Sequence, residues 1–262
     1  MLASGKQEQP SRRKVSHFGL ELLRPVWRPK TSDQLQVIRR RMERLSIALE
    51  REYGTPDLGN LADPLDEAVY IITTYQTDLE RAAKVWANLK ARFPSWEQVL
   101  DASVADLQRL LKPGGFHRIR AKLIRRLLWA VRSRWGELSL NALGNMTSKA
   151  AEAELRALPG LDIKGARCVL MYSLRRAVLP IDSNAFRFMQ RYGVIASNAR
   201  YRRLATHDEI QELVAPSQRY CLHVNLVAHG QSTCMPRNPK CCSCPVQRTC
   251  AKAHQRLKTG KG

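Results

Sequence analysis

The sequence predicts an all-α protein, and three observations support this. Apolar residues recur at intervals of three and four along most of the chain, no segment shows sustained strand alternation, and glycine and proline separate the periodic segments. With 262 residues, 44% of them hydrophobic, the chain can bury a substantial core in one or two domains.

Residues 1–32 come first and predict no regular element. Seven of the first 30 residues are Lys or Arg and the apolar periodicity is weak, which is typical of a loosely ordered basic arm that follows DNA phosphates. A mitochondrial transit peptide is also basic, but Glu8 and Glu21 disfavour that alternative.

Helical periodicity begins near residue 33. It is clearest in residues 35–54, 65–93, 104–111 and 120–136. Gly54, Gly136 and Gly193 stand near predicted helix ends, where glycine commonly stops a helix.

The charge of the chain indicates a polyanionic partner. Lys and Arg number 44 against 23 Asp and Glu, a net charge of +21, so nucleic acid is the first candidate. No apolar run approaches the ~20 residues of a membrane span, and the N-terminus lacks the apolar stretch of a secretory signal. We therefore expect a cytoplasmic, nucleoid-associated protein without membrane contact, and a monomer because no exposed apolar stripe stands out.

Residues 148–175 predict two helices joined by the tight turn Leu158-Pro159-Gly160-Leu161-Asp162. The backbone N–H groups of Gly160 and of the next helix, which starts near Ile163, would point outward, as in phosphate-binding helix N-termini. The alternative is an ordinary αα-hairpin. Asp182 directly precedes a later predicted helix, and its position alone predicts an N-cap. The position of Lys164 alone predicts an ordinary solvated lysine.

Five of the seven cysteines lie between residues 234 and 250. Cys234, Cys241, Cys244 and Cys250 follow the spacing C-x6-C-x2-C-x5-C, and Cys242 stands outside it. Such spacing suits an iron–sulfur cluster, a zinc site or a pair of disulfides, and a reducing compartment disfavours the disulfides. Cys168 and Cys221 fall on predicted apolar helix faces and are expected in the core.

Taken in order, the segments LPGLDIKGA, PIDSNAFR, AHGQSTC and the cysteine spacing resemble the endonuclease III family of DNA glycosylases, which are members of the helix-hairpin-helix superfamily. The resemblance runs from about residue 33 to 252. It implies double-stranded DNA with a damaged base or abasic site as substrate, and a [4Fe-4S] cluster held by the four spaced cysteines.

The resemblance also implies roles for individual residues. Lys164 matches the lysine that attacks C1′ of the damaged nucleotide and forms a Schiff base, and a desolvated, basic site is expected to lower its pKa. Asp182 matches the essential aspartate, which deprotonates the lysine or stabilises charge on the sugar. Arg237 and Lys240 match basic positions of the family's cluster loop that approach DNA phosphates.

Three further residues match the family's contacts to the opened duplex. Phe116 matches the wedge that enters the opposing side of the helix. Tyr75 falls where the family has a glutamine that fills the vacated stack, with Gln76 as its neighbour, although a tyrosine in an amphipathic helix is equally often half-buried packing.

The chain departs from the family pattern at three positions, Asp162, Asn184 and Tyr75. Asp162 replaces the hairpin's second glycine, so positive φ would have to be tolerated there and a negative charge would face phosphate. Asn184 replaces a histidine, and with Tyr75 it puts the choice of lesion in doubt. Oxidised pyrimidines are the family default, and the PIDSN form is similar to plant 5-methylcytosine glycosylases.

The expected architecture has two lobes with the catalytic cleft between them. Residues 60–176 form a central lobe with the hairpin, residues 33–59 and 177–252 form the cluster lobe, and residues 253–262 form a basic tail. The leading hypothesis is a bifunctional DNA glycosylase and abasic-site lyase of base excision repair. The alternatives are a non-catalytic or lyase-only damage-sensing module, a glycosylase for another lesion, and a zinc-stabilised helical DNA binder.

Overall fold

The computed structural model describes residues 31–258, and within them every regular element is a helix, as predicted. None of these helices is long and apolar enough to cross a membrane. The α-helices are α2 (Ser32–Tyr53), α3 (Pro64–Thr74), α4 (Leu79–Arg92), α5 (Trp96–Asp101), α6 (Val104–Leu111), α7 (His117–Trp135), α8 (Ser148–Ala157), α9 (Ile163–Cys168), α10 (Ser183–Tyr192), α11 (Leu204–Gln211), α12 (Arg219–Ser232) and α13 (Ala251–Lys258). Single turns join some of them: η1 (Lys112–Gly114), η2 (Asn141–Asn145), the π-helical η3 (Val169–Ser173), η4 (Pro216–Gln218) and η5 (Gln247–Thr249).

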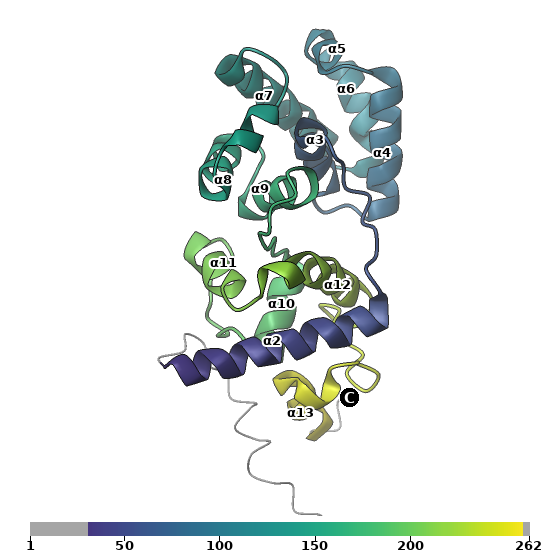
Figure 1. Ribbon diagram of the computed structural model, residues 1–262. Coiled ribbons are helices and arrows are strands. Elements are labelled where there is room, and N and C mark those ends of the chain that lie inside the picture. Colours follow the sequence, from purple (N-terminus) through teal and green to yellow (C-terminus); the bar gives the residue numbers. More distant parts are fainter. Residues whose placement is uncertain (1–30, 259–262) are drawn as a thin grey trace, which may run out of the picture.

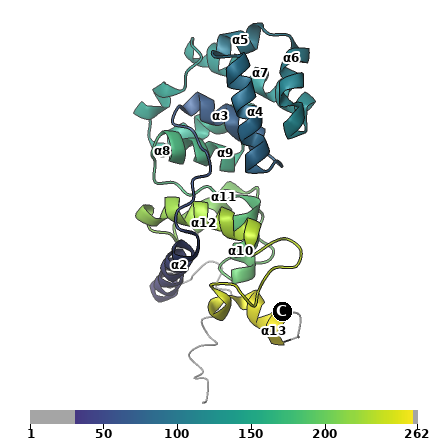
Figure 2. The same cartoon turned by 90° about the vertical axis from the view of Figure 1, so that its right-hand side faces the viewer.

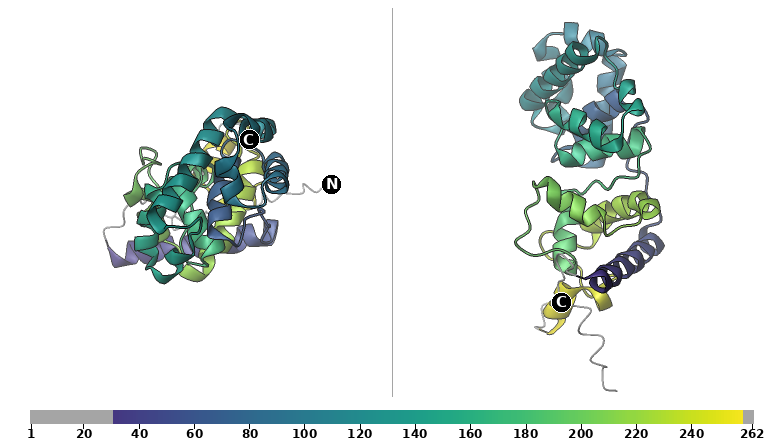
Figure 3. Two further views of the ribbon diagram at one scale, coloured as in Figure 1. Left: turned by 90° about the horizontal axis from the view of Figure 1, so that it is seen from above. Right: turned by 60° about the vertical axis from the view of Figure 1, so that its left-hand side comes forward.

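Two hydrophobic cores lie one above the other (Figures 1 and 2). The first, the hairpin core, is built from residues between 65 and 178, with Val224 of α12 added. The second, the cysteine core, is built from residues 38–49 of α2 and from residues 179–253. Two extended segments join the two bodies, one after α2 and one before α10, as Figure 3 shows from another side.

Local signals explain where the helices start and stop. Thr31 accepts a hydrogen bond from Gln34 N and begins α2, and Asp63 caps α3, with Pro64 as the first helical residue. Gly54, Gly136 and Gly193 end α2, α7 and α10 with positive φ, as predicted.

The prediction of continuous helical periodicity over residues 65–93 is wrong in its middle. The helix α3 ends at Thr74, and α4 starts only at Leu79, after a loop in which Gln76 has φ +54°. The reason is local, because the Asp78 side chain accepts a hydrogen bond from Arg81 N and starts a new helix. Tyr75 is therefore the cap residue after α3 and does not lie within a helix.

The two ends of the chain differ from expectation where they are described. The predicted basic arm lies outside the described residues except for residues 31 and 32, and Ser32 already belongs to α2. The predicted tail begins as helix, because α13 continues to Lys258, and residues 259–262 lie outside the described range.

Candidate active site and cysteine pocket

A pocket between the two cores brings Lys164 and Asp182 to one site. Lys164 comes from the first turn of α9 above it, and Asp182 is the residue before α10 below it. Other lining residues come from α3 and the loop after it, from α9, η3, α10 and α12, and from the loop after α10. Among them are Tyr70, Tyr75, Gln76, Cys168, Tyr172, Asn184, Tyr201, His223 and Gln231.

Both oxygens of the Asp182 carboxylate have partners. Oδ1 accepts from Ala185 N at 2.7 Å, which makes Asp182 the N-cap of α10 as the sequence indicated. Oδ2 accepts from Asn184 Nδ2 at 3.0 Å, and Asn184 Oδ1 in turn accepts from Arg187 at 2.9 Å. Gly230 of α12 leaves the room for Asn184, because a Cβ at residue 230 would lie 2.4 Å from the Asn184 Cβ.

Lys164 has acidic neighbours that oppose the effect of its burial. Burial lowers the pKa of Lys164, but a hydrogen bond with Cys168 and the negative charges of Asp182 and Glu67 outweigh this effect, and the pKa is raised. The expectation that the site lowers this pKa is therefore wrong for the protein without DNA. The amine is held protonated, and a nucleophilic role requires it to give up a proton.

Three buried groups lie around Lys164, and the sequence placed none of them at this site, although it predicted that Cys168 lies in the core. Glu67 of α3 is fully buried, and burial raises its pKa against hydrogen bonds from Leu61 N and Asn60. Burial likewise raises the pKa of Cys168 to about 12, so Cys168 stays a thiol near pH 7. Burial and the charge of Lys164 lower the pKa of His223 to about 4, so His223 stays a neutral imidazole. A carboxylate directly before the apolar stretch AVYII was the one signal that the sequence held for Glu67.

The hairpin joins α8 to α9 beside this pocket. Gly160 has φ +89°, and a Cβ there would lie 2.9 Å from Ile72 Cδ1, so both the turn and the packing need glycine. Asp162 has φ −93°, so the expected positive φ at this residue is wrong. Its carboxylate instead accepts from Gly165 N at 2.8 Å and caps α9.

Tyr75 reaches across to the hairpin. Its hydroxyl donates to Asp162 Oδ1 at 3.4 Å, and a Cβ at Gly165 would lie 2.7 Å from that hydroxyl oxygen. The half-buried Tyr75 side chain therefore packs on the start of α9, while its neighbour Gln76 is exposed.

Phe116 lies on a loop adjoining that of Gln76. Its side chain is 54% exposed and its φ is +48°, so it projects from the turn that begins α7. Arg120, which is only 3% exposed, joins the two loops by donating to the carbonyl oxygens of Gly114 and Tyr75. The sequence offered no signal for this arginine, because its partners are 6 and 45 residues away.

The four spaced cysteines line a second, smaller pocket in the cysteine core. Cys234, Cys241 and Cys250 are buried and Cys244 is partly buried, whereas Cys242 is exposed and outside the pocket. Of the other two, Cys168 is buried as expected, while Cys221 is only partly buried. All seven thiols are free, so the described chain holds no disulfide.

The donors of this pocket suit a soft metal centre. Within residues 31–258 no three His, Cys, Asp or Glu side chains stand in the arrangement of a ready metal-ion site. Four cysteines nevertheless line the pocket. Burial, together with the neighbouring Cys250, Cys234 and Cys241, raises the pKa of Cys244 to about 11, so this thiol needs a bound cation to become a thiolate near pH 7. His229 Nε2 lies 3.9 Å from Cys244 Sγ, and Arg237 and Lys240 are exposed on the loop beside the pocket.

Comparison with known proteins identifies the family. Residues 69–216, more than half of the chain, match the family described as HhH-GPD superfamily base excision DNA repair protein. The chain belongs to this superfamily. The segment matched includes the hairpin, Lys164 and Asp182, and it stops before the four spaced cysteines.

Relatives within this superfamily include a putative DNA glycosylase of Arabidopsis thaliana, 26% identical over 167 residues, and the thymine/uracil-DNA glycosylase of Pyrobaculum aerophilum, 23% identical over 214 residues. The first match covers 64% of this chain and 56% of the plant protein, and the second covers 79% and 88%. The chain thus spans little more than half of the first relative, and it matches only 9% of the rice protein ROS1C.

Solved structures share the HhH-GPD fold. A non-covalent endonuclease III–DNA complex matches with a TM-score of 0.73 at 16% identity, over 84% of this chain and 98% of that one. A thermostable thymine-DNA glycosylase matches with a TM-score of 0.69 at 19% identity, over 83% and 97%. At these identities the likeness establishes the fold.

Proposed function

We propose that this protein is a DNA glycosylase and abasic-site lyase of base excision repair, acting on damaged bases in duplex DNA, with oxidised pyrimidines as the first candidate substrates. The observation that carries the proposal is that Lys164 and Asp182 line one pocket, each at the start of a helix. The net charge of +21 and membership in the superfamily support DNA as the partner.

In the proposed reaction Asp182 accepts a proton from the Lys164 ammonium and passes it to the departing base, so its carboxylate is charged again as positive charge builds on the sugar. The neutral amine attacks C1′, and the bond to the base breaks with its electron pair leaving on the base. The attached nitrogen loses a proton, and the C1′–O4′ bond breaks with its electron pair going to O4′, which takes up a proton. The opened sugar is then a protonated Schiff base with Lys164. Loss of a C2′ proton expels the 3′ phosphate by β-elimination, and water finally releases the lysine.

The base must leave the duplex before this chemistry can occur. Gln76 lines the pocket and Phe116 lies on the adjoining loop, and both are exposed. We assign Phe116 to the opposing strand and Gln76 to the vacated stack. Tyr75 packs on α9, which leaves Gln76 better placed than Tyr75 to enter DNA. We assign contacts with DNA phosphates to Gly160 of the hairpin, and to Arg237 and Lys240 of the loop between Cys234 and Cys241.

We further propose that Cys234, Cys241, Cys244 and Cys250 hold a [4Fe-4S] cluster. When bound, it would supply a rigid anchor for the loop that carries Arg237 and Lys240. The protein's own contribution includes Arg191, which donates to Cys234 Sγ at 3.4 Å and to the Met235 carbonyl oxygen at 2.7 Å.

The test uses duplexes that carry thymine glycol, a G·T mismatch or an abasic site, with borohydride present to trap a Schiff base. We expect cleavage and a covalent complex with the wild type, and neither with Lys164→Gln. Asp182→Asn should bind the same DNA but excise at least ~100-fold more slowly. Cleavage of the abasic duplex alone would retain the lyase and exclude these bases.

A non-catalytic, damage-sensing protein is the second candidate, and the exposed Asp162 favours it by placing negative charge on the hairpin. Tight binding of all three duplexes without cleavage or trapping would establish this alternative.

A further inference from the structure

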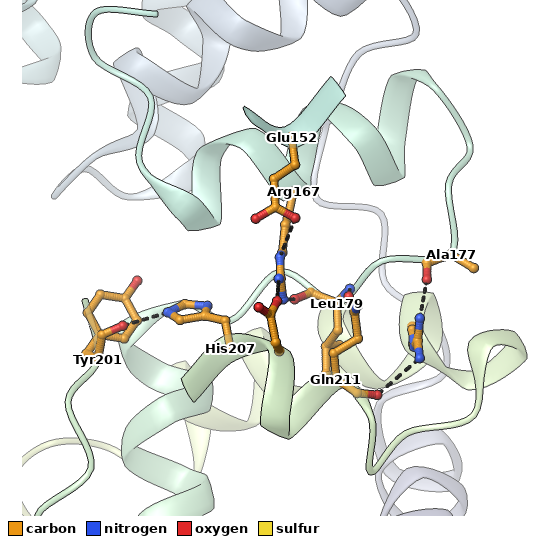
Figure 4. A network of polar contacts seen from close by, with 9 residues as sticks. Glu152, Arg167, Ala177, Leu179, Tyr201, His207 and Gln211 are labelled. Carbon is orange, nitrogen blue, oxygen red and sulfur yellow. Dashed lines mark hydrogen bonds and ion pairs between the residues drawn. The ribbon is translucent and has the colours of Figure 1, made fainter. Parts of the chain in front are cut away.

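Arg167 is a charged residue buried between the two cores. It lies on α9, one turn after Lys164, and is only 1% exposed. Its Nε donates to Glu152 of α8 at 3.2 Å, and its Nη2 donates to Asp208 of α11. Figure 4 shows the guanidinium extending from the hairpin side, where Glu152 lies, toward the helix below. The side chain therefore ties the helix that bears Lys164 to the opposite half of the molecule.

The same guanidinium also reaches the segment that connects Lys164 to Asp182. Nη1 donates to the Leu179 carbonyl oxygen at 3.5 Å, and Leu179 N donates to Gln211 Oε1 at 2.8 Å. Two residues before Leu179, the carbonyl oxygen of Ala177 accepts a hydrogen bond from Arg219 of α12, which also donates to the Gln211 carbonyl oxygen (Figure 4). Three side chains from three helices thus hold the stretch that ends three residues before Asp182.

We propose that Arg167, through its ion pair with Asp208, is a positioning residue that holds the Lys164 amine and the Asp182 carboxylate at their working separation. The two groups come from different cores, so the distance between them depends on contacts across the junction. Val224 of α12 packs into the hairpin core there, and the ion pair adds a directed contact, since a guanidinium has a fixed donor geometry. The inference rests on the proposed function.

We call the Arg167–Asp208 ion pair the clamp, and its two members differ in exposure. Arg167 is nearly inaccessible, so its charge is stabilised through the two carboxylates and the Leu179 carbonyl oxygen instead of by water. Of the two carboxylates, Glu152 lies on α8 in the same half of the molecule as Arg167, and Asp208 lies on α11 in the other half. The Asp208 side chain is 54% exposed, so replacing Asp208 does not alter a buried carboxylate.

The experiment compares Asp208→Asn with Asp208→Glu and with Glu212→Gln, whose exposed side chain lies at the end of the same helix. Single-turnover excision and borohydride trapping are measured at saturating DNA, with DNA affinity measured separately. Hydrogen exchange of residues 174–184 is followed on each full-length protein without DNA.

We expect Asp208→Asn to slow the single-turnover rate constant about tenfold, because small misplacements of reacting groups have large effects on rate. DNA affinity should stay within about twofold, exchange in residues 174–184 should speed up, and Asp208→Glu should recover most of the rate. Glu212→Gln should match the wild type.

Two outcomes would overturn the inference. If Asp208→Asn lowers only the amplitude of turnover and leaves the rate constant unchanged, Arg167 is merely structural. Unchanged exchange in residues 174–184 would show that the ion pair does not hold the segment. If the wild type neither excises nor traps any substrate, the proposed function fails, and the exchange measurement still decides whether the clamp exists.

Discussion

Asn184 donates a hydrogen bond to Asp182 Oδ2 at 3.0 Å and accepts one from Arg187 at 2.9 Å. The arginine fixes which end of the amide faces the carboxylate. Asn184, a departure from the family pattern, therefore orients the proposed catalytic aspartate.

Asn184→Ala should slow base excision by about tenfold or more, because a hydrogen bond to a charged group contributes roughly 1.5–3 kcal/mol. Single-turnover excision checks this. Gln231→Ala removes another amide from the same pocket and should have a much smaller effect. Equal rates for both variants would contradict the orienting role.

Gly165→Ala should destabilise the protein by about 1–3 kcal/mol, although alanine normally favours a helix, because the new Cβ would lie 2.7 Å from the Tyr75 hydroxyl. Tyr75→Phe removes that oxygen and should relieve much of the loss. Urea unfolding of the two single variants and the double variant measures the coupling. Additive effects would show that the hydroxyl is not the obstacle.

The rate of Schiff-base trapping on abasic DNA should rise with pH through the neutral range. Only the neutral amine attacks, and acidic neighbours raise the pKa of Lys164. Glu67→Gln removes one of these negative charges, so the pKa of Lys164 should fall and the profile should shift to lower pH. Glu97→Gln, at an exposed residue, is the control. A profile that stays in place would exclude Glu67 as a determinant.

Purified protein should be yellow-brown and contain iron and sulfide, because four cysteines line one pocket. Cys244→Ser should lose most of the iron, while Cys242→Ser, at an exposed thiol outside the pocket, should keep it. A colourless protein with one bound zinc would instead support the zinc alternative.

Arg237→Gln combined with Lys240→Gln should weaken DNA binding and reduce the slope of log affinity against log salt by about 1.8, which is two phosphate contacts. The matched control is Lys84→Gln with Arg109→Gln, two exposed residues already paired with Glu80 and Asp106. A loss of affinity with no change of slope would argue against direct phosphate contacts.

Much of the fold could be predicted because its signals are local. The helix α6 occupies residues 104–111, as its periodicity indicated, with Ser103 as its N-cap. The break at Tyr75–Asp78 was missed because apolar spacing continues across it, and the cap at Asp78 competes with that spacing. Asp162 was misjudged for the opposite reason, since the family pattern suggested a glycine conformation where a capping residue suffices.

The sequence by itself determined the helical class, the likeness of the hairpin and cysteine spacing to a known family, and the candidates Lys164, Asp182 and the four cysteines. These depend on residue type and spacing within one stretch of chain. Only the tertiary structure decided that Glu67, Cys168 and His223 surround Lys164, and that Arg167 spans the junction to Asp208. Such contacts join residues far apart in the chain, and the role of a buried charge depends on partners that no local sequence pattern specifies.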